Sequence, residues 1–147
     1  MAKLPTDHEW KTGDIITVRA APPTSGILFH QGIILVENDK VYVVHNTPMQ
    51  TNKYGGNIVK ETLEEFTTGA KREFKKVERS TITKERLYDV IKETKTEDFN
   101  YLHFNCEQFV HYTKTGEIKS HQTRRTLVII LMTLIFSGYM SWKNQKE

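Results

Sequence analysis

The sequence predicts an α+β domain followed by a C-terminal transmembrane helix, on three observations. Runs rich in β-branched residues and bounded by turn residues recur between 14 and 79, which is typical of strands. Helical spacing of apolar residues begins at 81, and a second helix start follows at 105. The third observation is a run of 17 uncharged residues at 126–142. Strands in the first part of a chain and helices in the second favour the α+β class.

The expected strands and helices follow from local composition. The segment Glu37-Asn38-Asp39-Lys40 between two apolar runs favours a hairpin, and Gly116 is a typical helix end. The charged segment 72–79 suits the edge of a sheet. The expected elements are a strand at 14–19, a hairpin of 27–36 and 40–46, strands at 57–63 and 72–79, and helices at 81–95 and 106–115.

A chain of 147 residues can form one modest core. Its net charge is +3 with basic and acidic residues interleaved, so we expect no nucleic-acid partner. One cysteine cannot close a disulfide within the chain, and from the polar start we expect no signal peptide. The expected organisation is a polar lead-in at 1–12, a folded domain at 13–118, a basic linker at 119–125, a transmembrane helix at 126–142 and a tail at 143–147.

The predicted hairpin brings two histidines to one sheet face. A tight, symmetric loop places Ile34 opposite Val43 and Gly32 opposite His45, so that His30 is a diagonal neighbour of His45. Diagonal neighbours are about 7–8 Å apart, within reach of two imidazole rings. A slip of one residue would turn every side chain to the other face. Taken singly, each histidine also fits a polar position on a strand surface.

The single cysteine lies at a predicted helix start. Asn105 is a good N-cap, and Gln108 three residues later completes a variant of the capping box. Phe104 and Phe109 have the spacing of a hydrophobic staple. Cys106 is then the first helical residue, where free N–H groups and the helix dipole favour a thiolate. A nucleophile is one interpretation, and a small buried apolar residue is the other.

The uncharged run at 126–142 predicts a membrane span. It extends about 25 Å as a helix, slightly less than a hydrocarbon core of about 30 Å. Tyr139 and Trp142 lie near its end, with arginines before it and lysines after it, as in interfacial anchors. A buried C-terminal helix is the alternative. We therefore expect a single-pass, tail-anchored protein whose folded domain faces the cytosol, with the bilayer as a partner.

Four segments of the chain are similar to one family. The sequence Asn-Cys-Glu-Gln-Phe-Val at 105–110 closely resembles the Asn-Cys-Glu-His-Phe-Val signature of the lecithin:retinol acyltransferase-like family, which includes the HRAS-like suppressor phospholipase-acyltransferases. The segment 13–16 looks like the Gly-Asp-Leu-Ile strand start of that family. The segments 29–34 and 43–45 match its two histidine strands, so the resemblance covers nearly the whole chain.

The resemblance implies a circularly permuted papain-like α+β fold of the NlpC type, with a small antiparallel sheet facing the cysteine helix. It implies that Cys106 is the nucleophile, His30 the base and His45 the residue that orients His30. Asn105 and Gln108 would support the helix start and the oxyanion site. The implied activity is that of a phospholipase A1/A2 and acyltransferase, which moves a fatty acyl group from a phosphatidylcholine-type lipid through a thioester. Water, an amine lipid or a lysolipid would accept the acyl group, without a cofactor or a metal.

Two residues depart from the family pattern. Gln108 replaces the usual histidine of the cysteine motif, and we do not expect that position to be catalytic. Gln31 stands where an aromatic residue often follows the base, so it is a candidate for an altered substrate wall.

Other functions remain open from the sequence. A papain-like peptidase or amidase would use the same three residues, and a non-enzymatic membrane-tethered adaptor could retain the fold. A zinc site from His103, Cys106 and His111 supplies at most three ligands, whereas a structural site usually has four. The oligomeric state cannot be read from the sequence.

Overall fold

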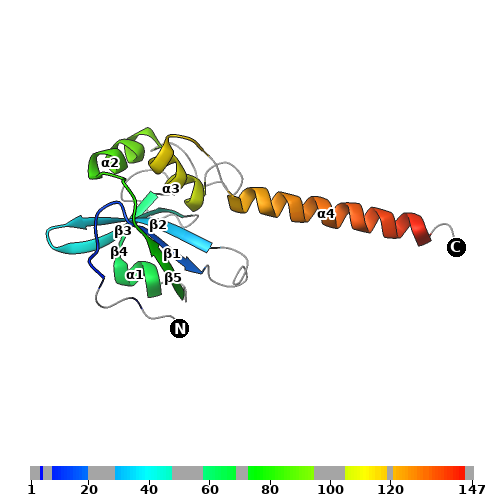
Figure 1. Ribbon diagram of the computed structural model, residues 1–147, viewed down its shortest axis with the longest axis horizontal. Helices are drawn as coiled ribbons and strands as arrows, with labels where there is room; N and C mark the ends of the chain where they lie inside the picture. The colour runs from blue at the N-terminus through cyan, green and yellow to red at the C-terminus, as the bar shows by residue number, and fades with distance from the viewer. Residues whose placement is uncertain are drawn as a thin grey trace.

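The computed structural model describes Leu4 and the segments 8–19, 29–47, 58–68, 73–94, 105–118 and 121–144. Five antiparallel strands form one sheet in the order β4-β3-β2-β1-β5 (Figure 1). The strands are β1 (Ile15–Arg19), β2 (Phe29–Glu37), β3 (Lys40–Asn46), β4 (Ile58–Thr62) and β5 (Glu73–Glu78), and the helices are α1 (Leu63–Thr68), α2 (Lys84–Glu93), α3 (Cys106–Thr115) and α4 (His121–Asn144). The α+β class and the antiparallel sheet are therefore as predicted, and the charged strand β5 lies at an edge.

The hairpin of β2 and β3 has the predicted register. Asn38 and Asp39 have φ angles of 49° and 60°, which suits a two-residue turn with positive φ at both positions. Ile34 is opposite Val43, as expected for a symmetric loop. The register matters because it decides which side chains share a face with the histidines.

Helices cover both faces of the sheet (Figure 1). On one face Ile33 and Leu35 of β2 belong to an apolar cluster with Phe109 of α3 and residues of α2. On the other face Ile34 packs in a second cluster with Phe66 of α1. This alternation along β2 follows from the two-residue period of a strand. Each face of β2 therefore faces a different helix, and backbone atoms of β2 lie between the two cores.

The Gly-Asp pair before β1 fixes the start of that strand. A side chain at Gly13 would place its Cβ 2.0 Å from the carbonyl oxygen of Ile82, and its φ is +96°. Asp14 is buried, and its carboxylate accepts hydrogen bonds from the Arg79 guanidinium at 2.6 Å and from the Lys11 backbone at 3.1 Å. This motif therefore has a structural role that the composition alone did not indicate.

The prediction of a transmembrane helix at 126–142 is wrong. In the part of the chain that the structure describes, no helix combines the length and the apolar character that crossing a membrane requires. The helix α4 starts at His121, inside the segment expected to be a linker, and ends at Asn144. Its uncharged run measures about 25 Å, less than a hydrocarbon core of about 30 Å. The remaining length comes from polar residues at its two ends.

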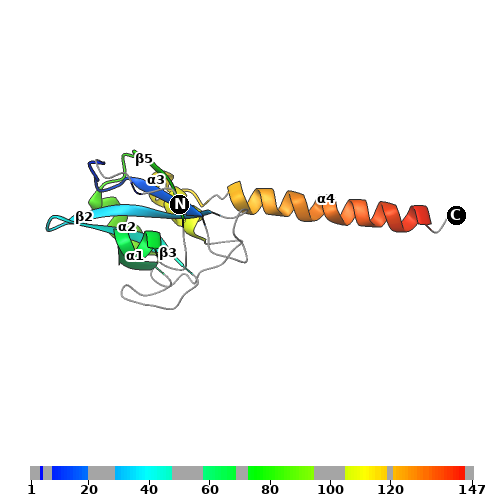
Figure 2. The same ribbon diagram turned by 90° about the horizontal axis from the view of Figure 1, so that it is seen from below.

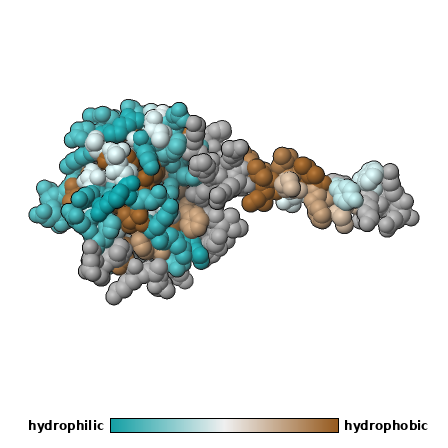
Figure 3. All heavy atoms as spheres, in the orientation of Figure 1, coloured by the Kyte–Doolittle hydropathy of each residue, from teal (hydrophilic) through white to brown (hydrophobic). Residues whose placement is uncertain are grey.

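The predicted location, a tail-anchored protein whose folded domain faces the cytosol, depended on that span and is therefore wrong too. The expectation of the bilayer as a partner was based on the same span. The helix α4 extends away from the sheet and its helices (Figures 1 and 2). Its apolar side chains are exposed along its length, as the brown surface in Figure 3 shows.

Candidate catalytic site

The two histidines meet across the hairpin. The Nε2 atom of His30, in β2, lies 2.8 Å from the Nδ1 atom of His45, in β3. The ring planes are nearly perpendicular, at 89°, with centroids 4.8 Å apart. His45 is fully buried and His30 is 9% exposed. The prediction that these residues share a face as diagonal neighbours is confirmed, and the separation is that of a hydrogen bond.

Glycine at position 32 makes this approach possible. A Cβ added to Gly32 would lie 2.3 Å from Cγ1 of Val43 and 3.3 Å from Cβ of His45. The first contact is far below van der Waals distance and involves a branched core side chain that cannot turn away freely. A larger residue would therefore push β3 or the His45 ring away from His30.

Phe66 of α1 packs on both imidazoles. Its ring stacks on His30 with centroids 5.5 Å apart, and meets the edge of His45 at 4.9 Å. The sequence reading missed both this residue and α1. A signal was present, because Thr62 and Glu65 form a capping box in which each accepts a hydrogen bond from the other's backbone N–H.

Glu61 is the second residue that the sequence reading missed. Its Oε2 atom lies 3.2 Å from Nε2 of His45, on the opposite side of that ring from His30. The strand β4 provides it, because Glu61 pairs with Val43 and Val59 pairs with His45. Residues opposite each other in an antiparallel pair share a face, which places the carboxylate beside the histidines. The sequence could not show this, since the pairing of β3 with β4 is non-local.

The capping box at the cysteine helix is confirmed. The side-chain oxygen of Asn105 accepts from the backbone N–H of Gln108 at 3.0 Å. In return, Oε1 of Gln108 accepts from the backbone N–H of Asn105 at 2.8 Å. Cys106 is the first residue of α3, which ends at Gly116 with φ 77°. The predicted staple involves Phe104, which lies outside the described residues.

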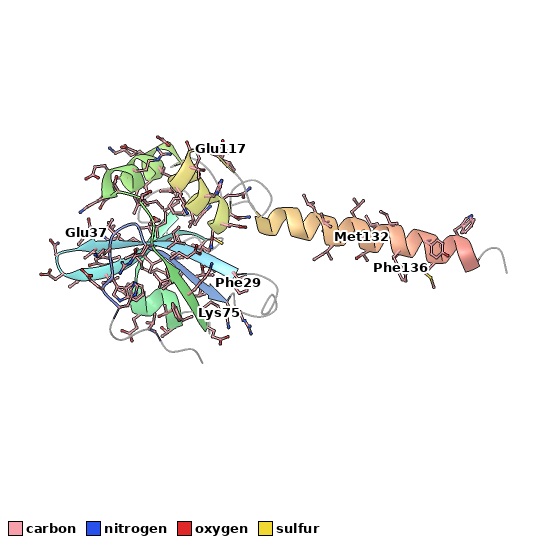
Figure 4. The ribbon with its side chains drawn as sticks, viewed as in Figure 1. Phe29, Glu37, Lys75, Glu117, Met132 and Phe136 are labelled. Carbon is pink, nitrogen blue, oxygen red and sulfur yellow. The ribbon has the colours of Figure 1, made fainter. Side chains whose placement is uncertain are left out.

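The thiol of Cys106 reaches the backbone of β2 next to His30. Its sulfur donates to the carbonyl oxygen of Phe29 at 3.9 Å. Phe29 is the first residue of β2 (Figure 4). In the His30 ring, Nε2 faces His45. The other nitrogen, Nδ1, is the one closer to Cβ and the backbone. Nδ1 is therefore the His30 nitrogen that the contact with His45 does not use.

The expected thiolate is not the resting form of the cysteine. Burial raises the pKa of the Cys106 thiol from 9.0 to about 11, and Glu107 adds to that rise. The backbone N–H groups of Gln31 and of the helix start act in the opposite direction, but they do not compensate for the loss of water. Desolvation thus outweighs the helix terminus, and the group rests as a neutral thiol.

Two predictions remain, the substrate-wall residue Gln31 and the zinc site. Gln31 donates from Nε2 to Oγ1 of Thr17 at 3.4 Å, which ties the predicted wall residue to β1. For the zinc hypothesis, His103 is not among the described residues. Within the segments that the structure describes, no group of three acidic, histidine or cysteine side chains is arranged to hold a metal ion.

No protein-family model, curated protein or solved structure is significantly similar to the chain. The chemistry of the site is therefore inferred from its own geometry. A neutral thiol contacts the backbone of the residue before His30, the His30 ring meets that of His45, and a carboxylate lies beyond His45. Such a set can move a proton from sulfur and so activate the thiol for attack on an acyl carbon.

Proposed function

We propose that the protein is a thiol enzyme that transfers acyl groups, with Cys106 as nucleophile, His30 as base and His45 as the residue that orients His30. The observation that carries the proposal is the 2.8 Å contact between Nε2 of His30 and Nδ1 of His45, beside a capped cysteine. That contact holds the His30 ring in one orientation and leaves Nδ1 as the nitrogen that would take the thiol proton.

The reaction begins with the neutral thiol. Sulfur attacks the carbonyl carbon of an ester as its proton passes to Nδ1 of His30, so that a C–S bond forms and the carbonyl oxygen becomes an oxyanion. The backbone N–H of Cys106 is free of the helical ladder and can donate to that oxyanion. The C–O bond then breaks, and His30 returns its proton to the departing alcohol.

A thioester of Cys106 is the product of the first half of the reaction. Water, an amine or the hydroxyl of a lysolipid attacks it next, His30 takes the proton of the attacking group, and the sulfur leaves to regain a proton. Hydrolysis gives a free fatty acid, and transfer gives an acylated acceptor. The raised pKa of the thiol suits proton removal during attack rather than a preformed thiolate.

The proposed acyl donor is a phosphatidylcholine-type phospholipid. This choice follows from the resemblance of segment 105–110 and the histidine strands to the phospholipase-acyltransferase family. One structural feature supports it, because Phe29, whose carbonyl contacts the thiol, is 40% exposed and gives the site an apolar border. An apolar border suits an acyl chain better than a polar peptide.

Mass spectrometry of the intact protein after incubation with phosphatidylcholine vesicles tests the proposal. We expect a mass increase of one acyl chain, located on Cys106 and removed by hydroxylamine. Cys106→Ala and His30→Ala should abolish it, whereas His111→Ala, at a partly exposed position later in α3, should not. An adduct formed from a peptide or amide but not from the lipid would favour a papain-like peptidase. The absence of any Cys106 adduct with lipid, ester or amide would favour a non-enzymatic adaptor.

A further inference from the structure

We infer that Glu61 is a positioning residue that fixes which nitrogen of each histidine carries the proton. The inference rests on the proposed roles of Cys106, His30 and His45, to which it adds a fourth member. Glu61 contacts Nε2 of His45, whereas His30 contacts Nδ1 of the same ring. Glu61 acts through the His45 ring.

The argument starts from what a carboxylate can do. An ionised carboxylate only accepts hydrogen bonds, so the ion-pair contact of 3.2 Å between Oε2 of Glu61 and Nε2 of His45 favours the ring form in which Nε2 carries the proton. In a neutral imidazole the other nitrogen then has a lone pair and accepts. Nδ1 of His45 is therefore the acceptor in its contact with His30.

The same argument applies to the His30 ring. Nε2 of His30, 2.8 Å from that acceptor, must be its protonated nitrogen. Nδ1 of His30 is left with the lone pair, and the Cys106 sulfur contacts the carbonyl oxygen of Phe29, the residue before His30. Glu61 thus selects the tautomer in which His30 can take the proton of the thiol.

Burial of the two rings strengthens the preference for this tautomer. His45 is fully buried, and Phe66 packs against both rings. An N–H group in such a place needs a partner from the protein, because water cannot replace that partner. The Glu61 side chain is 29% exposed, so water can solvate the part of the carboxylate that does not face His45.

The carboxylate also stabilises the charge that appears during the reaction. When His30 takes the thiol proton, a positive charge forms on the histidine pair within a buried site. A negative group beyond His45 lowers the energy of that state more than the energy of the neutral state. Both effects predict that Glu61 matters for the rate and not for substrate binding.

Three substitutions test the inference. Glu61→Leu removes the acceptor at similar size, Glu61→Asp keeps an acceptor-only group, and Glu64→Leu is a control at an exposed position on α1. Two readouts are needed. The first is the ¹⁵N chemical shifts of the imidazoles, which report the tautomers. The second is the rate of acyl-adduct formation on Cys106 from phosphatidylcholine vesicles.

In the unmodified protein we expect a proton on Nε2 of both His45 and His30. Glu61→Leu should disturb that tautomer and slow adduct formation on the order of 10²-fold at unchanged KM. Glu61→Asp should keep the tautomer and most of the rate, and Glu64→Leu should change neither. Unchanged tautomers in Glu61→Leu, or a proton on Nδ1 of His45 in the unmodified protein, would overturn the inference. If the expected tautomers appear but no lipid acyl group is ever transferred, the proposed substrate fails and the role of Glu61 stands.

Discussion

The Nδ1 atom of His45 lies 2.8 Å from the Nε2 atom of His30 across a hairpin in which the two residues are diagonal rather than opposite. A side chain that only orients His30 should be replaceable by another acceptor. We expect His45→Ala to slow acylation of Cys106 on the order of 10²-fold, and His45→Asn, whose Oδ1 can accept, to slow it less. Single-turnover kinetics with a phosphatidylcholine vesicle measures both rates. Equal rates for the two variants would contradict an acceptor role.

Substitution of Gly32 tests how closely β2 and β3 must approach each other. Gly32→Ala introduces a Cβ 2.3 Å from Cγ1 of Val43, so the pair of histidines must separate or the core must shift. We expect a loss of about 1–3 kcal/mol in the free energy of unfolding, measured with urea, and slower acylation. Gly116→Ala is the matched control, because its Cβ meets nothing within 4 Å although φ is +77°. It should lose about 1 kcal/mol and keep full activity in the folded protein.

Parts of the site could be predicted because the causes are local. The turn residues Asn38 and Asp39 set the register of β2 and β3, and that register brings His30 to His45. The capping box at 105–108 is a pattern of four consecutive residues, so the start of α3 could be located to the residue.

The rest depends on contacts between distant segments. Glu61 reaches His45 only because β4 pairs with β3, and Phe66 covers the rings only because α1 follows β4. The pKa of Cys106 depends on burial of α3 against β2, which outweighs the local helix terminus. The membrane helix was predicted from the absence of charge over 126–142, and that run lacks the length that a span requires.

The neutral thiol of Cys106 predicts a specific pH dependence. With a pKa of about 11, about 0.1% of the thiol is ionised at pH 8, so alkylation by iodoacetamide should be slow and should rise tenfold per pH unit up to about pH 10. The same shift means that the folded state binds more protons than the unfolded state between pH 9 and 11, so stability should fall as pH rises through that range. An alkylation rate that levels off near neutral pH would contradict a neutral resting thiol.

Glu37, at the end of β2, predicts how the fold responds to acid. Hydrogen bonds from Lys60, Tyr88 and Lys84 lower the pKa of its carboxyl from 4.5 to about 2. A lowered pKa contributes stability above pH 4.5 that is lost as pH falls toward 2. We expect Glu37→Gln to cost about 1–2 kcal/mol at pH 7, with allowance for solvent screening, and the difference from the unmodified protein to vanish near pH 2. Urea unfolding at pH 7, 4.5 and 3 measures the difference in free energy of unfolding between Glu37→Gln and the unmodified protein. Glu64→Gln is a control at an exposed position. A difference that stays constant with pH would show that the carboxylate charge is not the cause.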